Sequence, residues 1–66
     1  MKIHKFEVYV LDFEGYGPED YKSKIEYEIP FVNVSYQGSS SDIEWTDDHV
    51  LNKKTATIET WRKYVI

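Results

Sequence analysis

The first part of the chain alternates apolar and polar residues. Across residues 2–13, one face holds the apolar side chains of Phe6, Val8 and Val10, and the opposite face begins with charged residues. A repeat of two residues is typical of a β-strand, in which successive side chains point to opposite faces. The pattern therefore predicts a strand whose apolar face turns toward a hydrophobic core.

The alternation returns on both sides of a proline. Residues 24–29 and residues 31–37 each place apolar side chains at every second position, and Pro30 stands between the two runs. Proline has no N–H to donate, so Pro30 belongs at a sheet edge, at a bulge, or between two separate strands. The connections are too short for parallel crossovers, and antiparallel pairing is expected.

Residues 12–20 have the composition of a loop. Gly15 and Gly17 permit unusual backbone dihedrals, and Pro18 pre-sets φ for a turn. Proline is also favoured at the first position of a helix, so residues 18–21 are compatible with a single helical turn.

The last third of the chain favours a helix. Apolar residues recur at helical spacing over residues 47–65, Thr46 suits an N-cap, and two acids follow it directly. Two alternatives stay open. The β-branched residues in this region would also suit a strand over residues 55–66, and residues 41–44 form a capping-box sequence that would start the helix early. Before the helix, Ile43 and Trp45 alternate with acids and indicate a short strand.

These elements predict an α+β fold, in which a three- to four-stranded antiparallel sheet carries one C-terminal helix packed on one face. An all-β fold is the alternative. A chain of 66 residues forms one domain, spanning residues 1–66. The expected core consists of Phe6, Val8, Val10, Ile25, Tyr27, Ile29, Val32, Val34, Tyr36, Leu51, Ile58, Trp61 and Val65.

Composition narrows the classes of protein further. The chain has no cysteine, which excludes disulfides and thiolate zinc sites. It has no apolar run near the roughly 20 residues that cross a bilayer, and its N-terminus does not resemble a signal peptide. We therefore expect no membrane association and a cytoplasmic location, which would be the host cytoplasm if the protein is viral.

Catalytic and metal-binding patterns are weak. The carboxylate pairs Asp12/Glu14 and Asp47/Asp48 have little depth in which to be desolvated. His49 beside Asp47 and Asp48 offers too few convergent ligands for a metal. Neither a phosphate-binding glycine loop nor a nucleophile with a histidine partner is present. We expect no enzyme activity, no catalytic residue, no metal and no cofactor.

Charge and aromatic residues indicate binding to a protein. Residues 6–21 contain five acids and residues 39–52 contain four, without a lysine or arginine in either stretch. Exposed aromatic residues beside acids suit a basic protein surface, whereas the negative charge disfavours nucleic acid. The alternative is that the acids serve solubility and the rings pack in the core or a homodimer. The predicted partner-binding residues are Asp12, Phe13, Glu14, Tyr16, Glu19, Asp20, Tyr21, Asp42, Glu44, Asp47 and Asp48.

The acid- and tyrosine-rich body over residues 6–14 and the short C-terminal stretch over residues 58–64 resemble the small accessory proteins of tailed bacteriophages in general character. The resemblance implies an inhibitor of a host enzyme or defence system, sometimes a DNA mimic, and transfers no functional residue. The predicted function is thus a non-catalytic binding protein that inhibits or regulates a protein partner. A small structural or self-associating homodimeric protein is the alternative, and a nucleic-acid binder using the basic residues at positions 53, 54, 62 and 63 comes third.

Overall fold

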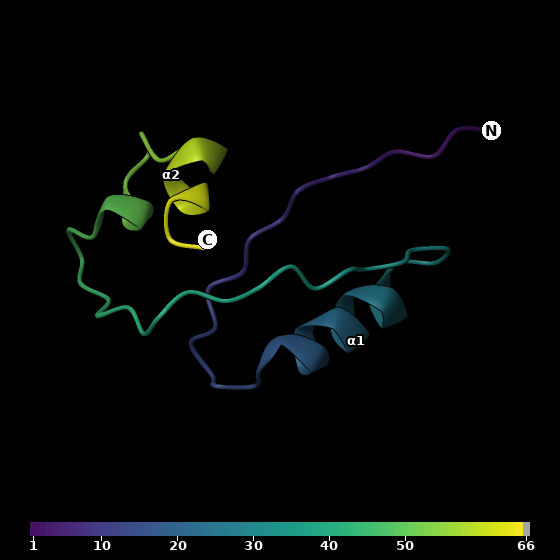
Figure 1. Cartoon of the computed structure of the whole chain (residues 1–66), viewed down its shortest axis with the longest axis horizontal. Helices are drawn as coiled ribbons and strands as arrows, with labels where there is room; N and C mark the ends of the chain where they lie inside the picture. Colours follow the sequence, from purple (N-terminus) through teal and green to yellow (C-terminus); the bar gives the residue numbers. More distant parts are fainter. Residues whose placement is uncertain (66) are drawn as a thin grey trace. The chain divides into compact units, whose positions relative to one another are not determined.

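The computed structural model describes residues 1–65 and contains two α-helices and one 3-10 helix. These are α1 (Pro18–Glu28), η1 (Val50–Asn52) and α2 (Ile58–Arg62) (Figure 1). The remaining described residues form turns, bends and segments without regular secondary structure, and the N-terminal residues run as an extended trace in Figure 1. Ile66, the last residue of the alternative strand over residues 55–66, lies outside the described part.

The predicted α+β fold is wrong, because no strand occurs anywhere in residues 1–65. The all-β alternative is wrong for the same reason. The strand predicted over residues 2–13 is absent, because these residues join no ladder within the described part of the chain (Figure 1). Alternation describes which face of a segment is apolar, and a sheet also requires a neighbouring strand whose backbone groups accept and donate in register.

The predicted strand over residues 24–29 lies mostly inside α1. The helix begins at Pro18, which occupies its first turn, and Glu19 and Asp20 follow where acids offset the positive end of the helix dipole. The predicted helical turn at residues 18–21 is therefore confirmed and continues to Glu28. Tyr27, expected in the core, is 87% exposed because the helix turns it away from Ile25.

The other predicted strands, over residues 31–37 and residues 42–45, are extended or irregular chain. The turn that precedes the first of them places Phe31 at φ 58°, a left-handed conformation that non-glycine residues rarely adopt. The side chain of Phe31 is 106% exposed. Its ring therefore gains nothing from packing to offset the backbone strain.

The predicted C-terminal helix over residues 47–65 is also wrong as a single element. Two short helices, η1 and α2, are separated by a turn through residues 53–55. Neither alternative holds over the described residues, since residues 41–44 start no helix and residues 55–65 form no strand. The helical spacing of the apolar residues spans a region that contains three threonines, whose branched side chains are stiff in a helix.

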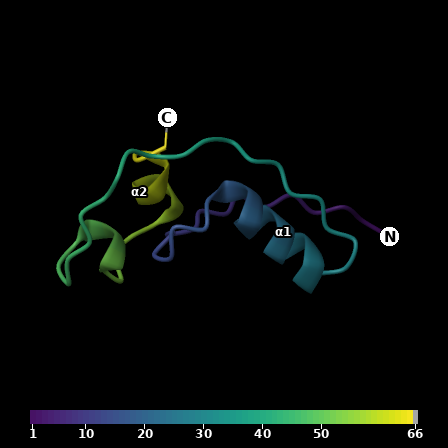
Figure 2. The ribbon, with the colours of Figure 1, turned by 90° about the horizontal axis from the view of Figure 1, so that it is seen from below.

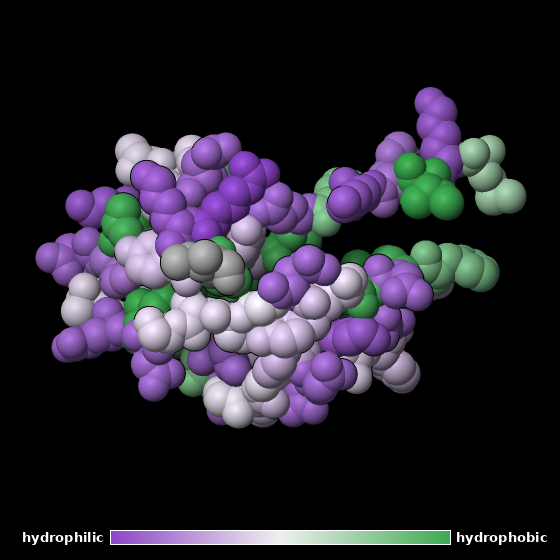
Figure 3. Space-filling view, viewed as in Figure 1, coloured by the Kyte–Doolittle hydropathy of each residue, from purple (hydrophilic) through white to green (hydrophobic). Residues whose placement is uncertain are grey.

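The chain divides into two compact units, Met1–Tyr36 and Gln37–Ile66. The single domain over residues 1–66 stays a prediction. Among the described residues, only Leu51 is buried, with 6% of its surface exposed. Figure 3 accordingly shows hydrophobic residues at the surface, interspersed with hydrophilic ones. Of the expected core, Leu51 is buried, whereas Phe6, Val8, Val10, Tyr27, Ile29, Tyr36 and Ile58 are exposed.

Candidate functional site

The loop before α1 is organised by one carboxylate. Oδ1 of Asp12 accepts hydrogen bonds from the backbone N–H of Gly15 at 2.8 Å and of Tyr16 at 3.1 Å. Oδ2 accepts from the N–H of Gly17 at 3.0 Å. Gly15 and Gly17 have φ of 73° and 85°, which glycine adopts without steric cost. The loop Asp12–Gly17 is thus a defined structure held by its own first residue.

The same carboxylate also reaches the beginning of α1. The hydroxyl of Tyr21 donates to Oδ1 of Asp12 at 3.2 Å, and the Tyr21 N–H donates to the carbonyl oxygen of Gly17 at 3.4 Å. The hydrogen bond from the Gly17 N–H is the main cause that lowers the pKa of Asp12. The pKa of Tyr21 is raised, first by desolvation and then by its bond to Asp12.

An aromatic pair with a cation lies beside this loop. The rings of Tyr16 and Tyr21 are 6.0 Å apart at an interplanar angle of 57°. The ammonium group of Lys24, one turn further along α1, is 4.2 Å from the centre of the Tyr16 ring, a cation–π distance. The sequence interpretation did not single out Lys24, although its spacing of three from Tyr21 places both on neighbouring positions of a helix.

The far part of α1 is joined to the chain that returns from it. The backbone N–H of Val34 donates to Oε2 of Glu26 at 3.0 Å, and the ammonium of Lys22 binds Oε1 of the same carboxylate at 3.2 Å. These contacts lower the pKa of Glu26, with the Val34 hydrogen bond as the larger cause. The returning segment after α1 can be followed in Figure 2.

The second acidic stretch belongs to the other unit, which also contains a cluster of three rings. Trp45 stacks on His49 with ring centres 5.2 Å apart, and the His49 ring is 5.8 Å from that of Tyr64. The backbone N–H of Leu51 donates to Nδ1 of His49 at 3.1 Å, which makes His49 the N-cap of η1. Sequence reasoning missed this cluster, because its members are separated by up to nineteen positions and share no period.

The acids of this stretch are exposed, and two of them take part in a turn. The hydroxyl of Thr46 donates to Oδ1 of Asp48 at 2.8 Å, and the side-chain amide of Asn52 donates to the carbonyl oxygen of Asp47 at 3.1 Å. Thr46 therefore holds a turn instead of capping a long helix.

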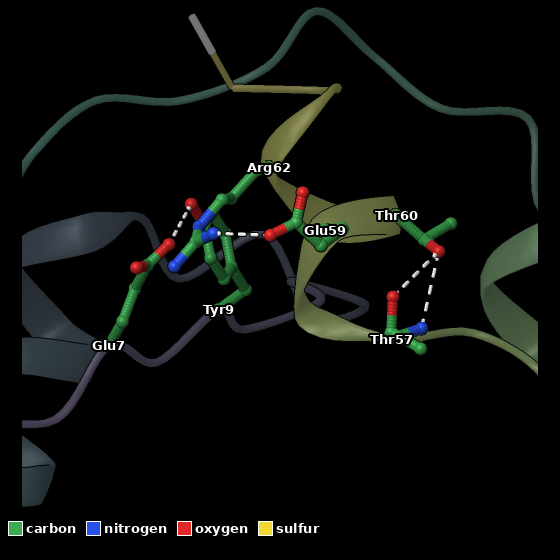
Figure 4. Close-up of polar contacts among 6 residues, drawn as sticks. All are labelled: Glu7, Tyr9, Thr57, Glu59, Thr60 and Arg62. Carbon is green, nitrogen blue, oxygen red and sulfur yellow. Dashed lines mark hydrogen bonds and ion pairs between the residues drawn. The ribbon is translucent and has the colours of Figure 1, made fainter.

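Figure 4 shows the polar contacts of α2. Oγ1 of Thr60 accepts from the backbone N–H of Thr57 at 3.2 Å, so a side chain in the first turn of α2 satisfies the N–H of its N-cap residue. Arg62 donates to Oε1 of Glu59 at 2.8 Å, one turn earlier. One base of the basic C-terminal stretch is therefore engaged within its own helix.

The predicted partner-binding residues fall in two sets, one in each unit. The first lies on the loop and the beginning of α1 and consists of Asp12, Phe13, Glu14, Tyr16, Glu19, Asp20 and Tyr21. The second lies in the other unit and consists of Asp42, Glu44, Asp47 and Asp48. Within the first set, Tyr21 is half-buried and hydrogen-bonded to Asp12, and the other residues are exposed, Asp12 among them.

In residues 1–65, no three histidine, cysteine or acidic residues gather closely enough to hold a metal ion. None of the helices in this same part combines the length and the apolar character needed to cross a membrane. Comparison with known protein families, with characterised proteins and with solved structures finds no match to this chain.

Proposed function

We propose that this chain is a non-catalytic binding protein that inhibits or regulates a protein partner through the loop surface. The loop surface comprises the exposed residues Phe13, Glu14, Tyr16, Glu19 and Asp20. The observation that carries the proposal is the set of three backbone hydrogen bonds to Asp12, which hold this loop in one conformation. A loop that is ordered before binding loses less conformational entropy when a partner docks.

The chemistry of the loop surface supports a basic protein as the partner. Two exposed rings, Phe13 and Tyr16, supply apolar contact area of the kind that anchors protein interfaces. Three exposed carboxylates, those of Glu14, Glu19 and Asp20, belong to the same surface, and no lysine or arginine lies between residues 6 and 21. A negative surface of this kind accelerates association with a positive one and disfavours phosphate backbones.

The internal contact between Lys24 and Tyr16 gives a chemical precedent for recognition. The Tyr16 ring already holds one ammonium group at 4.2 Å, so a lysine or arginine of a partner would meet a ring and carboxylates suited to it. Inhibition of a host enzyme or defence protein, as implied by the resemblance to phage accessory proteins, is one role for such a surface.

Two variants of equal charge change test the proposal. The loop variant combines Glu14→Gln, Glu19→Gln and Asp20→Asn, and the turn variant combines Asp42→Asn, Glu44→Gln and Asp47→Asn. Each immobilised protein is used to capture proteins from a lysate, with quantification by mass spectrometry and elution by rising salt. We expect the parent and the turn variant to retain the same partner, and the loop variant to lose it, because salt-sensitive binding depends on the loop acids.

Circular dichroism must first show that both variants keep the helical signal of the parent. Asp12 is left unchanged in both, because its removal would unfold the loop and would not separate folding from binding. Equal retention of the same proteins by the loop variant and the parent would overturn the proposed function.

A further inference from the structure

The N-terminal extended segment, residues 2–10, presents a row of apolar side chains to solvent. Phe6, Val8 and Val10 are exposed by 82%, 68% and 48%, and they lie two residues apart. In an extended chain this spacing puts all three on one face. On the other face, the Tyr9 hydroxyl donates to Oε2 of Glu7 at 2.6 Å, another contact across two residues (Figure 4).

We propose that this segment pairs side by side and antiparallel with the same segment of a second copy of the chain, about a two-fold axis at Val8. Extended backbone with alternating apolar side chains is the form in which chains pair edge to edge. The pairing is a contact between two molecules, and the helices and loops of each chain remain as described. The paired residues 2–10 lie outside the loop surface, and only the charge of Glu14 belongs to both; the association is tested without the loop variant and does not rest on the proposed function.

Charge along the segment selects a second copy in the antiparallel direction. The segment begins with the bases Lys2 and Lys5, and the acids Asp12 and Glu14 follow at its other end. Antiparallel pairing places the basic end of each copy beside the acidic end of the other. Parallel pairing would place like charges together, which destabilises neighbouring strands.

The positions of the apolar residues select the register. A two-fold axis at Val8 sets Val8 against its own copy and Phe6 against Val10, so that apolar residues meet apolar residues on the shared face. An axis at Glu7 would bring two carboxylates together. An axis at Phe6 would set Val8 against His4. A shift of the pairing by one residue would set the apolar face of one copy against the polar face of the other. The axis at Val8 keeps all three exposed apolar side chains in contact.

Sedimentation equilibrium over a wide range of concentrations tests the association. The parent is expected to dimerise. Val8→Lys should raise the dissociation constant roughly ten-fold or more, because two ammonium groups would then face each other across the axis. Tyr27→Lys is the matched control, since it replaces another exposed apolar residue with lysine on α1, and it should leave the dissociation constant unchanged. A parent that is monomeric throughout, or a dimer that tolerates Val8→Lys, overturns the proposal.

Cysteine cross-linking tests direction and register, because the natural chain has no cysteine. Oxidation should join the copies of a Val8→Cys variant, whose substituted positions lie opposite each other within disulfide range. A Lys5→Cys variant should stay uncross-linked, because residue 5 lies opposite residue 11 of the other copy and the two thiols are about 20 Å apart. Equal cross-linking of both variants would show parallel or irregular association and would overturn the arrangement. Loss of partner capture by the loop variant leaves these results unaffected, so the two proposals fail separately.

Discussion

The hydroxyl of Tyr21 donates a hydrogen bond to Oδ1 of Asp12 across 3.2 Å, and this contact joins α1 to the loop that precedes it. Asp12 at the same time accepts three backbone N–H groups of that loop. The carboxylate predicted to contact a partner therefore has a structural role, and the neighbouring exposed residues are left to form the loop surface.

Acid should weaken the first unit. The pKa values of Asp12 and Glu26 are lowered from their ordinary values of 3.8 and 4.5. The stabilisation from these carboxylates is therefore complete above their unfolded pKa values and is lost as pH falls through the folded ones. We expect the helical circular dichroism signal to hold from neutral pH down to about 4.5 and to decrease below it. A Glu26→Gln variant should show a smaller decrease than the parent, and an identical acid profile would contradict this assignment.

Alkaline pH should weaken the first unit by ionising Tyr21. Its pKa is raised above the ordinary value of 10.0, so the neutral phenol is favoured in the folded chain. That contribution is complete below pH 10.0 and is lost as pH rises through the folded pKa. The difference between tyrosinate absorbance titrations of the parent and Tyr21→Phe should report a phenol that ionises later than free tyrosine. A difference curve centred below the ordinary value would be the contrary result.

Replacing Phe31 with glycine should stabilise the chain. Phe31 has φ 58° and a fully exposed ring, so Phe31→Gly removes backbone strain without loss of packing. Part of the gain is offset by the greater freedom of glycine in the unfolded chain, which leaves about 0.5–1 kcal/mol. Urea denaturation measures the change. Phe31→Ala is the control, because it removes the ring but keeps the strained Cβ, and it should give no comparable gain.

The start of α2 should depend on the hydroxyl of Thr60. Thr60→Val keeps the shape of the side chain but removes the acceptor for the Thr57 N–H, and it should destabilise α2 locally by about 1 kcal/mol. Thr60→Ser keeps the hydroxyl and should be nearly neutral. Hydrogen exchange of the Thr57 amide, followed by NMR, measures both. Equal protection in the two variants would show that the backbone bonds of the helix suffice.

Nδ1 of His49 should protect the Leu51 amide in η1. His49→Phe keeps an aromatic ring between Trp45 and Tyr64 but removes the acceptor at 3.1 Å, and it should cost about 1 kcal/mol of local protection. His49→Asn restores an acceptor at the N-cap without the stacked ring. Amide exchange at Leu51 should therefore be fast in His49→Phe and slow in His49→Asn. The reverse order would assign the protection to stacking alone.

Local conformational preferences were readable from individual residues. Gly15 and Gly17 marked the loop before α1, and Pro18 marked a helical turn, because the covalent structure of these residues restricts or frees φ regardless of the rest of the chain. The strand prediction over residues 24–29 failed because Ile25 fits both periods. In the structure, α1 continues through these residues to Glu28, and the Val34 N–H binds Glu26 from the returning segment.

In the candidate site, too, some features follow from the sequence and others only from the tertiary structure. Sequence alone established the acidic stretches, the aromatic residues beside them and the absence of cysteine, since these are properties of composition and order. Tertiary structure alone decided that Asp12 binds the backbone of its own loop, that Phe13 and Tyr16 stay exposed, and that the His49 ring contacts those of Trp45 and Tyr64. Contacts between residues far apart in the chain depend on which loops close. That outcome follows from the balance of chain entropy and contact energy over the whole molecule, and no local pattern contains it.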